Sequence, residues 1–563
     1  MIIGILQLNS TVGDFRANRQ KLLAGYEKAL ALGAEFILAP ELFLCGYPPR
    51  DLLLREDFTG ANLSALDETA KNIGAIPLCV GFVGKNSEKP GRALKNSAAV
   101  LQNGKIIWRT HKSLLPTYDV FDEDRYFEPA KTVAPLEFNG QKIGITICED
   151  IWNDEDFWPE RIYRRDPVSE LISQGAQIIL NISASPWHVG KEKTRLEMLQ
   201  RVARDEKVPI VQANLVGAND ELIFDGHSVA LDSRGEVIAL GKSFAEEILV
   251  ADLDFGGASV LASQKESDER LARTFAPPIF PAREQQIFSA LSLGIRDYVL
   301  KCGFKSVIVG LSGGIDSALV AVLATDALGA ENVLGVAMPS RHSSAGSLTD
   351  AEMLAKNLGI RHEVFPIEPV FNSVEKQLEK AFANFKPNEA EENVQSRLRG
   401  VTLMALSNKF GALVLTTGNK SEMAVGYCTL YGDMNGALAP IADVMKTDIY
   451  KIARWVNREK IVIPENSISK PPSAELRPNQ TDQDSLPPYE TLDAILDLYV
   501  VKNLGKEEIV ARGFAAETVG DVLNKINFSE YKRRQAAPAL KISPRAFGMG
   551  RRIPIAQKFR TKI

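Results

Sequence analysis

A six-residue segment, SGGIDS at residues 312–317, limits the possible folds of this chain more than any other feature. It follows a short continuous apolar run, VIVGL, of the kind found in parallel strands buried on both faces. From residue 317 the sequence SALVAVLATDAL has helical periodicity and good helix-forming residues. A strand that passes through such a loop into a helix predicts a parallel α/β sheet with a ligand site at the loop.

The loop has the properties of a phosphate-binding turn. Unpaired N–H groups and the dipole at a helix N-terminus attract anions, and glycine allows the backbone to approach them closely. Asp316 would repel a phosphate unless a cation lay between them, and Mg²⁺ held by a carboxylate and phosphate oxygens meets this requirement. An ordinary turn capped by Ser and Asp is the structural alternative, and the strand and helix on either side favour phosphate binding over it.

This strand, loop and helix resemble the pyrophosphate loop of the N-type ATP pyrophosphatases. The Lys-Ser/Thr ending of a Walker A loop is missing. The resemblance implies that the chain splits ATP between its α and β phosphates and adenylates a carboxyl or carbonyl oxygen. A nitrogen or sulfur nucleophile would then displace AMP.

The length of 563 residues predicts at least two domains. Residues 1–255 alternate short apolar strands with helical segments, the clearest of which, 17–33, should end at Gly33. Residues 256–285 are mixed in charge and then proline-rich, so we interpret them as a linker. Residues 286–563 open with a second strand and helix series, which predicts a doubly wound parallel sheet. The clearest expected strands are IGILQL, FILAPE, PLCVGFV, IGITIC and IILNISAS, then SVIVGL, NVLGVAMP, HEVFPI and ALVLTTGN.

Composition excludes several classes of protein. A net charge of −5 gives no overall attraction to nucleic acid or membranes, and no apolar run reaches transmembrane length. The first residues, MIIGILQLNS, lack the features of a signal peptide. The five cysteines are scattered and form no CxxC pair, so we expect neither disulfides nor a zinc site, and a cytoplasmic location.

Three residues of the first half stand out by context. Glu41 in PELFLCGYPP lies past a predicted strand, Lys112 lies in THKSLLP, and Cys148 ends the apolar strand of ITICEDIW. Each alone has an ordinary explanation, a buried inert thiol or a solvated charge. Together, in this order, they resemble the Glu–Lys–Cys triad of the nitrilase superfamily, which implies an αββα sandwich.

The resemblance also implies a role for each residue. Cys148 would attack an amide carbonyl, Glu41 would take the thiol proton, and Lys112 would hold the oxyanion. A cationic neighbour lowers the pKa of a thiol, and a carboxylate shielded from water can act as a base near neutral pH. Glu123 matches a second family glutamate that orients the site, and the positions matched to glutamine binding are Tyr118, Ser185 and Lys191.

An amide hydrolase joined to an ATP pyrophosphatase predicts that ammonia passes from one to the other. The second half is similar to NAD synthetases in NVQSRLRG, TTGNKSEMAVGYCTLYGDMNG, LAPIADVMKTDIY, KPPSAELRPNQTD and EYKRRQ. With the nitrilase-like half in front, nearly the whole chain resembles the glutamine-dependent NAD synthetases. The implied substrates are deamido-NAD, ATP and glutamine, and the products are NAD, AMP, pyrophosphate and glutamate.

The same resemblance assigns site residues in the second half. Asp316 and Glu422 would hold Mg²⁺, and Glu422 should lie in a loop past a strand end. Arg397 is a further candidate for a phosphate, because its planar fork suits that geometry. The positions matched to ATP binding are Gly310, Leu311, Ser312, Gly313, Gly314, Ile315, Asp316, Ser317, Thr417 and Lys446. Those matched to deamido-NAD binding are Asn393, Glu422 and Lys532.

Two alternatives stay open from the sequence. Other ATP pyrophosphatases modify a purine nucleotide, aspartate or tRNA, so the acceptor could differ. The first half could also be a scaffold, with external ammonium as the nitrogen source. Residues 464–490 are polar and proline-rich, either a solvated loop or a lid, and residues 531–563 hold ten Lys or Arg and no acid. We expect local attraction of anionic substrates from the first basic residues of that tail, no binding to nucleic acid or membrane, and a homo-oligomer.

Overall fold

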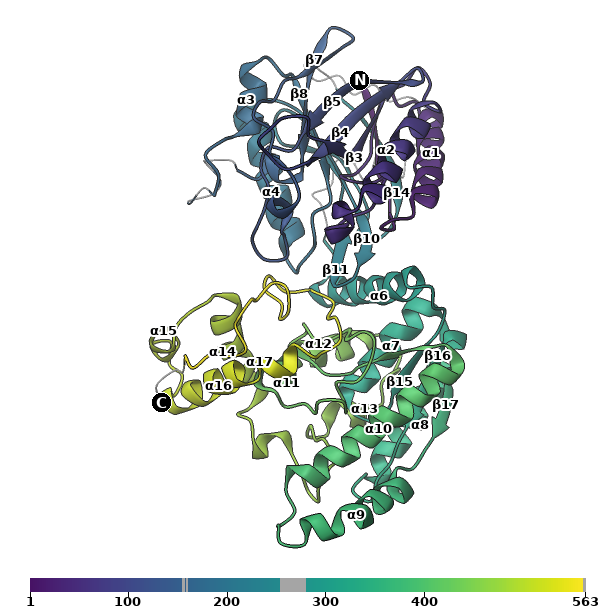
Figure 1. Ribbon diagram of the computed structural model, residues 1–563, viewed down its shortest axis with the longest axis vertical. Helices are drawn as coiled ribbons and strands as arrows, with labels where there is room; N and C mark the ends of the chain where they lie inside the picture. The colour runs from purple at the N-terminus through teal and green to yellow at the C-terminus, as the bar shows by residue number, and fades with distance from the viewer. Residues whose placement is uncertain (154–156, 158–159, 161, 254–279, 560–563) are drawn as a thin grey trace. The chain divides into compact units, whose positions relative to one another are not determined.

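The computed structural model describes residues 1–153, 157, 160, 162–253 and 280–559, and the chain divides into two compact units (Figure 1). The first unit spans Met1–Pro281 and the second Ala282–Ile563. Most of the expected linker, residues 256–279, lies outside the described residues. No helix in the described part of the chain is long and apolar enough to cross a membrane.

The first unit contains two six-stranded sheets and a separate hairpin. One sheet has the order β14-β1-β2-β3-β4-β5, and the other has the order β13-β12-β9-β8-β7-β6. The strands of the first sheet are β1 (Ile2–Gln7), β2 (Phe36–Leu38), β3 (Leu78–Lys85), β4 (Leu94–Gln102), β5 (Lys105–His111) and β14 (Glu247–Asp252). Those of the second are β6 (Leu136–Phe138), β7 (Gln141–Ile147), β8 (Ile178–Ser183), β9 (Ile210–Asn214), β12 (Val229–Leu231) and β13 (Val237–Leu240). The hairpin is formed by β10 (Val216–Asn219) and β11 (Leu222–Asp225).

Side chains of both sheets share one apolar core. Ile3 and Ile5 of β1 belong to the same cluster as Ile143 and Ile145 of β7, so the two sheets pack face to face. The alternate residue Leu6 belongs to a second cluster that covers the outer face. That face carries α1 (Phe15–Ala31) and α2 (Glu56–Ala70), and the outer face of the other sheet carries α3 (Pro167–Ser173) and α4 (Lys191–Glu206). The architecture is the expected αββα sandwich.

Parallel pairing explains why these strands could be predicted from the sequence as continuous apolar runs. Strands β1, β2 and β3 run parallel, as do β7, β8 and β9, and both faces of each are covered. Covered faces require near-continuous apolar runs. The helix expected at 17–33 is α1, and Gly33 follows its end with a φ of +84°.

The second unit is built on a parallel sheet in the order β17-β16-β15-β18. Its strands are β15 (Val307–Gly310), β16 (Val333–Ala337), β17 (Arg361–Val364) and β18 (Leu413–Leu415). The helices before and between them are α6 (Arg283–Lys301), α7 (Ile315–Leu328), α8 (Ala345–Leu358), α9 (Glu368–Phe382) and α10 (Glu389–Phe410). This is the doubly wound arrangement predicted from the sequence.

After β18 the described chain is mainly helical. The helices are α11 (Lys420–Val425), α12 (Lys446–Val456), α13 (Glu465–Ser469), α14 (Tyr489–Leu496), α15 (Lys506–Val510), α16 (Ala516–Phe528) and α17 (Glu530–Arg533). A π-helical turn at Asp497–Val501 continues α14. Helices α11, α14 and α16 enclose a small apolar core of their own, which fixes the position of α11 next to the strand ends.

Two candidate active sites

The backbone at Cys148 is held in an unusual conformation. Cys148 starts a 3₁₀ turn after β7 and has a φ of +44°. A non-glycine residue in this region costs about 1–3 kcal/mol and is found most often at functional sites. Asp150 stabilises the turn, because its Oδ1 accepts the N–H groups of Ser113 and Leu114 at 2.9 Å and its Oδ2 accepts that of Ile147 at 3.1 Å. The same contacts tie the turn to the segment that carries Lys112.

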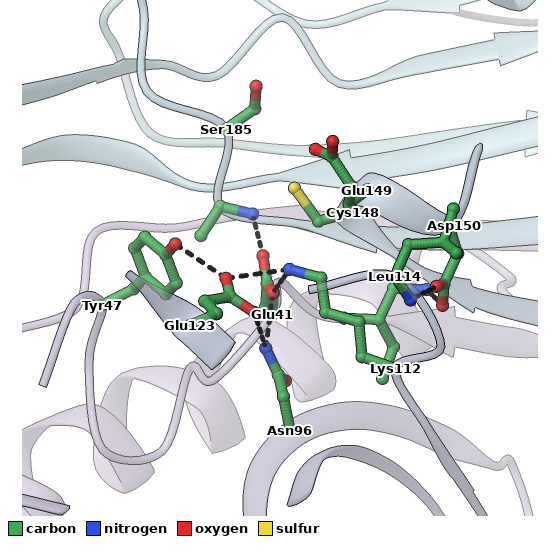
Figure 2. A network of polar contacts seen from close by, with 12 residues as sticks. Glu41, Tyr47, Asn96, Lys112, Leu114, Glu123, Cys148, Glu149, Asp150 and Ser185 are labelled. Atoms are coloured by element: carbon green, nitrogen blue, oxygen red, sulfur yellow. Dashed lines mark hydrogen bonds and ion pairs between the residues drawn. The ribbon is translucent and has the colours of Figure 1, made fainter. Parts of the chain in front are cut away.

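Beside this turn, one buried lysine bridges two buried carboxylates (Figure 2). The Nζ of Lys112 donates to Glu41 Oε1 at 2.8 Å and to Glu123 Oε1 at 2.9 Å. The Nδ2 of Asn96 donates to Glu41 at 2.7 Å and Tyr47 OH donates to Glu123 at 2.9 Å. The structure therefore brings together residues from four separate loops and strand ends, including all three triad residues and Glu123.

Charges in this cluster set the protonation of its members. Burial opposes the charge on Lys112, but Glu123 and Glu41 outweigh it and hold the Lys112 pKa well above its usual value. Burial raises the pKa of Glu123 although Lys112 opposes the rise. Burial also raises the pKa of Cys148, Glu41 adds to this, and Lys112 offsets only part of it. The neighbouring cation does lower the thiol pKa, as expected, but burial and Glu41 outweigh it, so the thiol of Cys148 needs a base.

Two of the residues matched to glutamine binding lie near Cys148. The hydroxyl of Tyr118 donates to Glu149 Oε1 at 2.8 Å, next to Cys148. The backbone N–H of Ser185 donates to Asn214, and Figure 2 shows the Ser185 side chain on the same side of the site as the Cys148 sulfur. Lys191 begins α4 and donates to Pro186 O at 2.8 Å.

Glu149 was missed by sequence reasoning. Its side chain is buried and accepts hydrogen bonds from Tyr118 and, at 3.2 Å, from Tyr163. Its position directly after Cys148, at the end of an apolar strand, is the signal that could have pointed to it.

The second unit holds a cavity of about 470 Å³ at the carboxyl ends of its strands. The loops after β15, β16 and β18 line it, together with α10 and residues 470–476. Of the residues predicted for this half, those lining the cavity are Gly310, Leu311, Ser312, Gly314, Ile315, Asp316, Ser317, Asn393, Thr417, Glu422, Lys446 and Lys532. Residues 464–490 are thus a wall of the cavity over part of their length, not only a solvated loop.

Gly313 packs closely against α8. It has a φ of +74°, and a Cβ there would lie 2.3 Å from the backbone oxygen of Ser347 in α8. Gly313 does not line the cavity, so close packing of the loop against α8 requires this glycine.

A second buried lysine joins two carboxylates in this cavity. Lys446, which is only 2% exposed, forms an ion pair with Asp316, and its Nζ lies 3.7 Å from Glu422 Oε1. Burial, and then the charge of Asp316, raise the pKa of Glu422 to about 8. Glu422 is the third residue of α11 rather than part of a loop, and it caps that helix with Asn419. Asn419, also missed from the sequence, donates to Asp316 Oδ1 at 3.0 Å.

The arginine of this cavity is Arg399, not Arg397. Arg399 lines the cavity and donates to Met338 O at 3.0 Å, and burial lowers its pKa. Arg397 is absent from the cavity wall and donates to Leu430 O at 3.2 Å. Both lie on α10, and the helical spacing decides which of the two faces the strand ends.

Part of the basic tail contributes to the cavity. The Nζ of Lys532 donates to the backbone oxygens of Gly426 and Cys428 at 2.7 Å. Farther along, Lys420 donates to Ser543 Oγ at 2.6 Å and to Arg545 O at 2.9 Å, so the described tail packs against its own unit.

Comparison with known proteins gives matches to both halves. The model of the carbon-nitrogen hydrolases matches residues 2–262, and that of the NAD synthases matches residues 287–536. A glutamine-dependent NAD(+) synthetase of Synechocystis sp. is 47% identical over 561 residues, 99% of this chain and 99% of that one. One of Thermotoga maritima is 47% identical over 588 residues, 100% of this chain and 99% of that one.

Solved structures agree with these matches. The glutamine-dependent NAD+ synthetase from Acinetobacter baumannii, in complex with adenosine diphosphate, is 37% identical with a TM-score of 0.76 and 98% of each chain covered. One from Cytophaga hutchinsonii is 22% identical, and its TM-score of 0.80 over 99% of this chain and 98% of that one shows the same fold. Since the relatives match over nearly their whole length, the chain belongs to the family of glutamine-dependent NAD(+) synthetases.

Proposed function

We propose that the first unit releases ammonia from glutamine at Cys148 and that the second uses it to amidate deamido-NAD at the cavity. The protein is a carbon–nitrogen ligase with glutamine as the amide nitrogen donor. The observation that carries the assignment of residues is the buried lysine between Glu41 and Glu123 beside Cys148. A scaffold with no catalytic role would not require three charged groups in a buried position.

In the glutaminase step, Glu41 takes the proton of Cys148 as the sulfur attacks the amide carbon. Lys112, kept protonated by its two carboxylates, donates a hydrogen bond to the oxyanion. Glu41 returns the proton to the leaving nitrogen, and ammonia departs from a thioester. Water, deprotonated by Glu41, then cleaves the thioester and releases glutamate, which regenerates the thiol.

Polar and charged groups near Cys148 can bind the α-ammonium and α-carboxylate groups of glutamine. Glutamine has an α-ammonium group, for which the buried carboxylate of Glu149 is a suitable partner beside Tyr118. Ser185 and Lys191 are the donors we assign to its α-carboxylate. Removal of the charge on Glu149 or on Lys191 should raise KM for glutamine more than it lowers kcat.

In the second unit, the loop from Gly310 to Ser317 binds the phosphates of ATP at the N-terminus of α7. Asp316 and Glu422 supply oxygen ligands of the kind Mg²⁺ prefers, and the ion would take its remaining ligands from phosphates and water. When bound there, Mg²⁺ would supply positive charge that neutralises the phosphates. Lys446 lies between the two carboxylates and is placed to contact the same phosphates.

The remaining cavity residues fit deamido-NAD. Asn393, Glu422 and Lys532 are the assigned contacts, and Arg399 adds a cation for one of the phosphates. The nicotinate carboxylate attacks the α-phosphate of ATP and pyrophosphate leaves. Ammonia then attacks the acyl carbon of the adenylate, and AMP leaves as the amide forms.

A homo-oligomer and a cytoplasmic location complete the proposal. The second unit exposes several apolar side chains, namely Val364 at the end of β17, Phe365 after it, Val370 on α9, Phe385 after α9, and Val401 and Phe410 on α10. A second copy covering them would explain their exposure. The five cysteines are free, and the nucleophile must stay reduced, as it does in cytoplasm. Light scattering coupled to gel filtration measures the oligomeric state directly.

One assay tests the main proposal. Purified protein is mixed with deamido-NAD, ATP, Mg²⁺ and glutamine, and NAD and AMP are measured together. Equal amounts of both support the proposed acceptor, cleavage position and nitrogen source. AMP without NAD contradicts the acceptor, and failure with both glutamine and ammonium contradicts the assignment of the phosphate loop.

A further inference from the structure

A buried hydrogen-bond network reaches the glutaminase site from the base of the β10–β11 hairpin. Residues 184–188 follow β8 and pass the catalytic cluster. The N–H of Ala184 donates to Glu41 Oε2 at 2.9 Å, and that of Ser185 donates to Asn214 Oδ1 at 3.0 Å. The N–H of Trp187 donates to Ile223 O of β11 at 2.6 Å. This short segment therefore holds the proposed base on one side and is held by β9 and the hairpin on the other.

Asn214 is the central side chain of this network. It ends β9, is 0% exposed, and uses both ends of its amide. While Oδ1 accepts the Ser185 N–H, Nδ2 donates to Gly226 O at 2.7 Å and to Asp225 Oδ1 at 3.2 Å. The orientation of the amide is therefore determined. In a flipped amide, the NH₂ group would face the N–H of Ser185, and the oxygen would face the oxygens of Asp225 and Gly226.

Asp225 fixes Asn214 in turn. Its Oδ2 accepts from Arg195 Nη2 at 2.6 Å and pairs with His227 Nδ1 at 3.1 Å. Burial acts to raise the pKa of Asp225, but Arg195 and His227 outweigh it and lower it to about 2, so the group is a carboxylate. A charged acceptor makes the hydrogen bond from Asn214 stronger than a neutral one.

We propose that Asn214, oriented by Asp225, is a positioning residue for the glutaminase, and that it acts by holding residues 184 and 185 against Glu41. This inference rests on the proposed role of Glu41 as the base. Glu41 is fixed at Oε1 by Lys112 and Asn96 and at Oε2 by Ala184. A shift of the loop by about 1 Å would turn the carboxylate away from the thiol, and misplacement on this scale costs roughly 100-fold in rate.

The test compares Asn214→Ala with Asn62→Ala in the full-length protein. Asn62 is a matched control, since it is 0% exposed, lies in the same unit, and bonds the backbone of Val83 in both directions. Both of these hydrogen bonds go to Val83, which faces Asn96 across β3 and β4, so Asn62 lies one strand pair away from the catalytic cluster. We expect both variants to lose thermal stability and only Asn214→Ala to lose glutaminase kcat, by about 10- to 100-fold. Ammonium-dependent NAD synthesis, made by the other unit, should stay within about twofold in both.

Exchange of the two side chains gives a second, independent readout. Asn214→Asp places a carboxylate against Asp225 and should lower glutaminase kcat at least as much as the alanine variant. Adding Asp225→Asn restores a donor–acceptor pair between the two side chains and leaves an oxygen for Arg195 and His227, but it does not restore the hydrogen bond to Gly226 O. We expect the double variant to recover part of the kcat that Asn214→Asp loses, because the like-charge pair is removed.

Three outcomes separate the possible failures. Equal losses of kcat in Asn62→Ala and Asn214→Ala overturn the inference, because the effect would then follow stability alone. A double variant no more active than Asn214→Asp also overturns it. Undiminished use of glutamine by Cys148→Ala would contradict the proposed function itself.

Discussion

At the scale of single residues, the two sites use the same arrangement of charges. In each, a buried lysine lies between two acids, Lys112 between Glu41 and Glu123 and Lys446 between Asp316 and Glu422. The acids keep each lysine charged against the effect of burial. A charged donor in a buried position is strong, because little solvent screens it. In the proposed mechanism, Lys112 directs this charge at an oxyanion and Lys446 directs it at phosphates.

Replacement of the nucleophile should separate the two activities. Cys148→Ala removes the sulfur without changing the charges around it. We expect it to reduce glutamine-dependent NAD synthesis by at least about 10⁴-fold, the scale seen when a catalytic nucleophile is lost, and to keep the ammonium-dependent rate. Both rates are measured by NAD formation, and normal glutamine use by this variant would favour the scaffold alternative.

Replacement of the shared carboxylate in the second unit should stop both reactions. Asp316→Ala leaves Lys446 without its nearest partner and removes a proposed Mg²⁺ ligand. We expect NAD synthesis to fail with glutamine and with ammonium, while glutamate release from glutamine continues. Binding of Mg²⁺–ATP, followed by calorimetry, should weaken, and unchanged binding would contradict the assigned role.

His111 predicts a pH dependence of stability in the first unit. Burial lowers its pKa to about 4, and its Nδ1 is 2.7 Å from Ser97 Oγ. Below about pH 6.5, His111 binds a proton in the unfolded chain but stays neutral in the folded chain until the pH approaches 4. Stability is therefore lost as the pH falls from about 6.5 to 4, by at most about 1.4 kcal/mol per pH unit. The free energy of unfolding, measured with urea at several pH values in this range, should depend less steeply on pH in His111→Gln than in the unaltered protein.

At the scale of elements, the sequence predicts where strands end. It predicts less well which side chains from distant parts of the chain meet at those ends. The runs VIVGL and IGITIC become β15 and β7 because both faces of each are covered. Asn96, Asn214 and Arg399 could not be assigned from the sequence, since their partners are distant in the chain. The choice of Arg397 failed because the rotation of α10 about its axis is set by packing, which one sequence does not reveal.

The loop between β15 and α7 offers a test of an element. Gly313→Ala adds a methyl group 2.3 Å from Ser347 O, at a φ of +74°. Gly303, with a φ of +82° and nothing within 4 Å, gives the matched control for backbone strain alone. We expect Gly303→Ala to cost about 1 kcal/mol and Gly313→Ala clearly more, with weaker ATP binding. Equal unfolding free energies for the two variants would show that the packing against α8 is unimportant.

At the scale of the whole molecule, two units with separate cores carry two halves of one reaction. Each half has its own sheet architecture, and the apolar clusters among the described residues each draw on one unit. The chemistry nevertheless joins them, because ammonia released into neutral water becomes protonated and is then a poor nucleophile. Because one chain carries both units, the activity that releases ammonia and the activity that uses it are always present in equal amounts.

Mixing two variants that each keep one half of the reaction tests how ammonia is delivered. Asp316→Ala protein should release ammonia from glutamine, and Cys148→Ala protein should accept it only through solution. We expect the mixture to form NAD far more slowly than the unaltered protein at equal glutamine turnover, and to improve as the pH rises. A mixture as fast as the unaltered protein at neutral pH would mean that free ammonia suffices.

The raised pKa of Cys148 has a consequence for the life of the protein in a cell. Peroxide and electrophiles react with thiolates, and a thiol that keeps its proton in a buried site is a poor target for them. In the proposed mechanism, Cys148 is therefore protonated at rest and reacts when Glu41 takes its proton beside a substrate carbonyl. Durability and selectivity follow from one feature, since the same burial that delays ionisation also excludes other reagents.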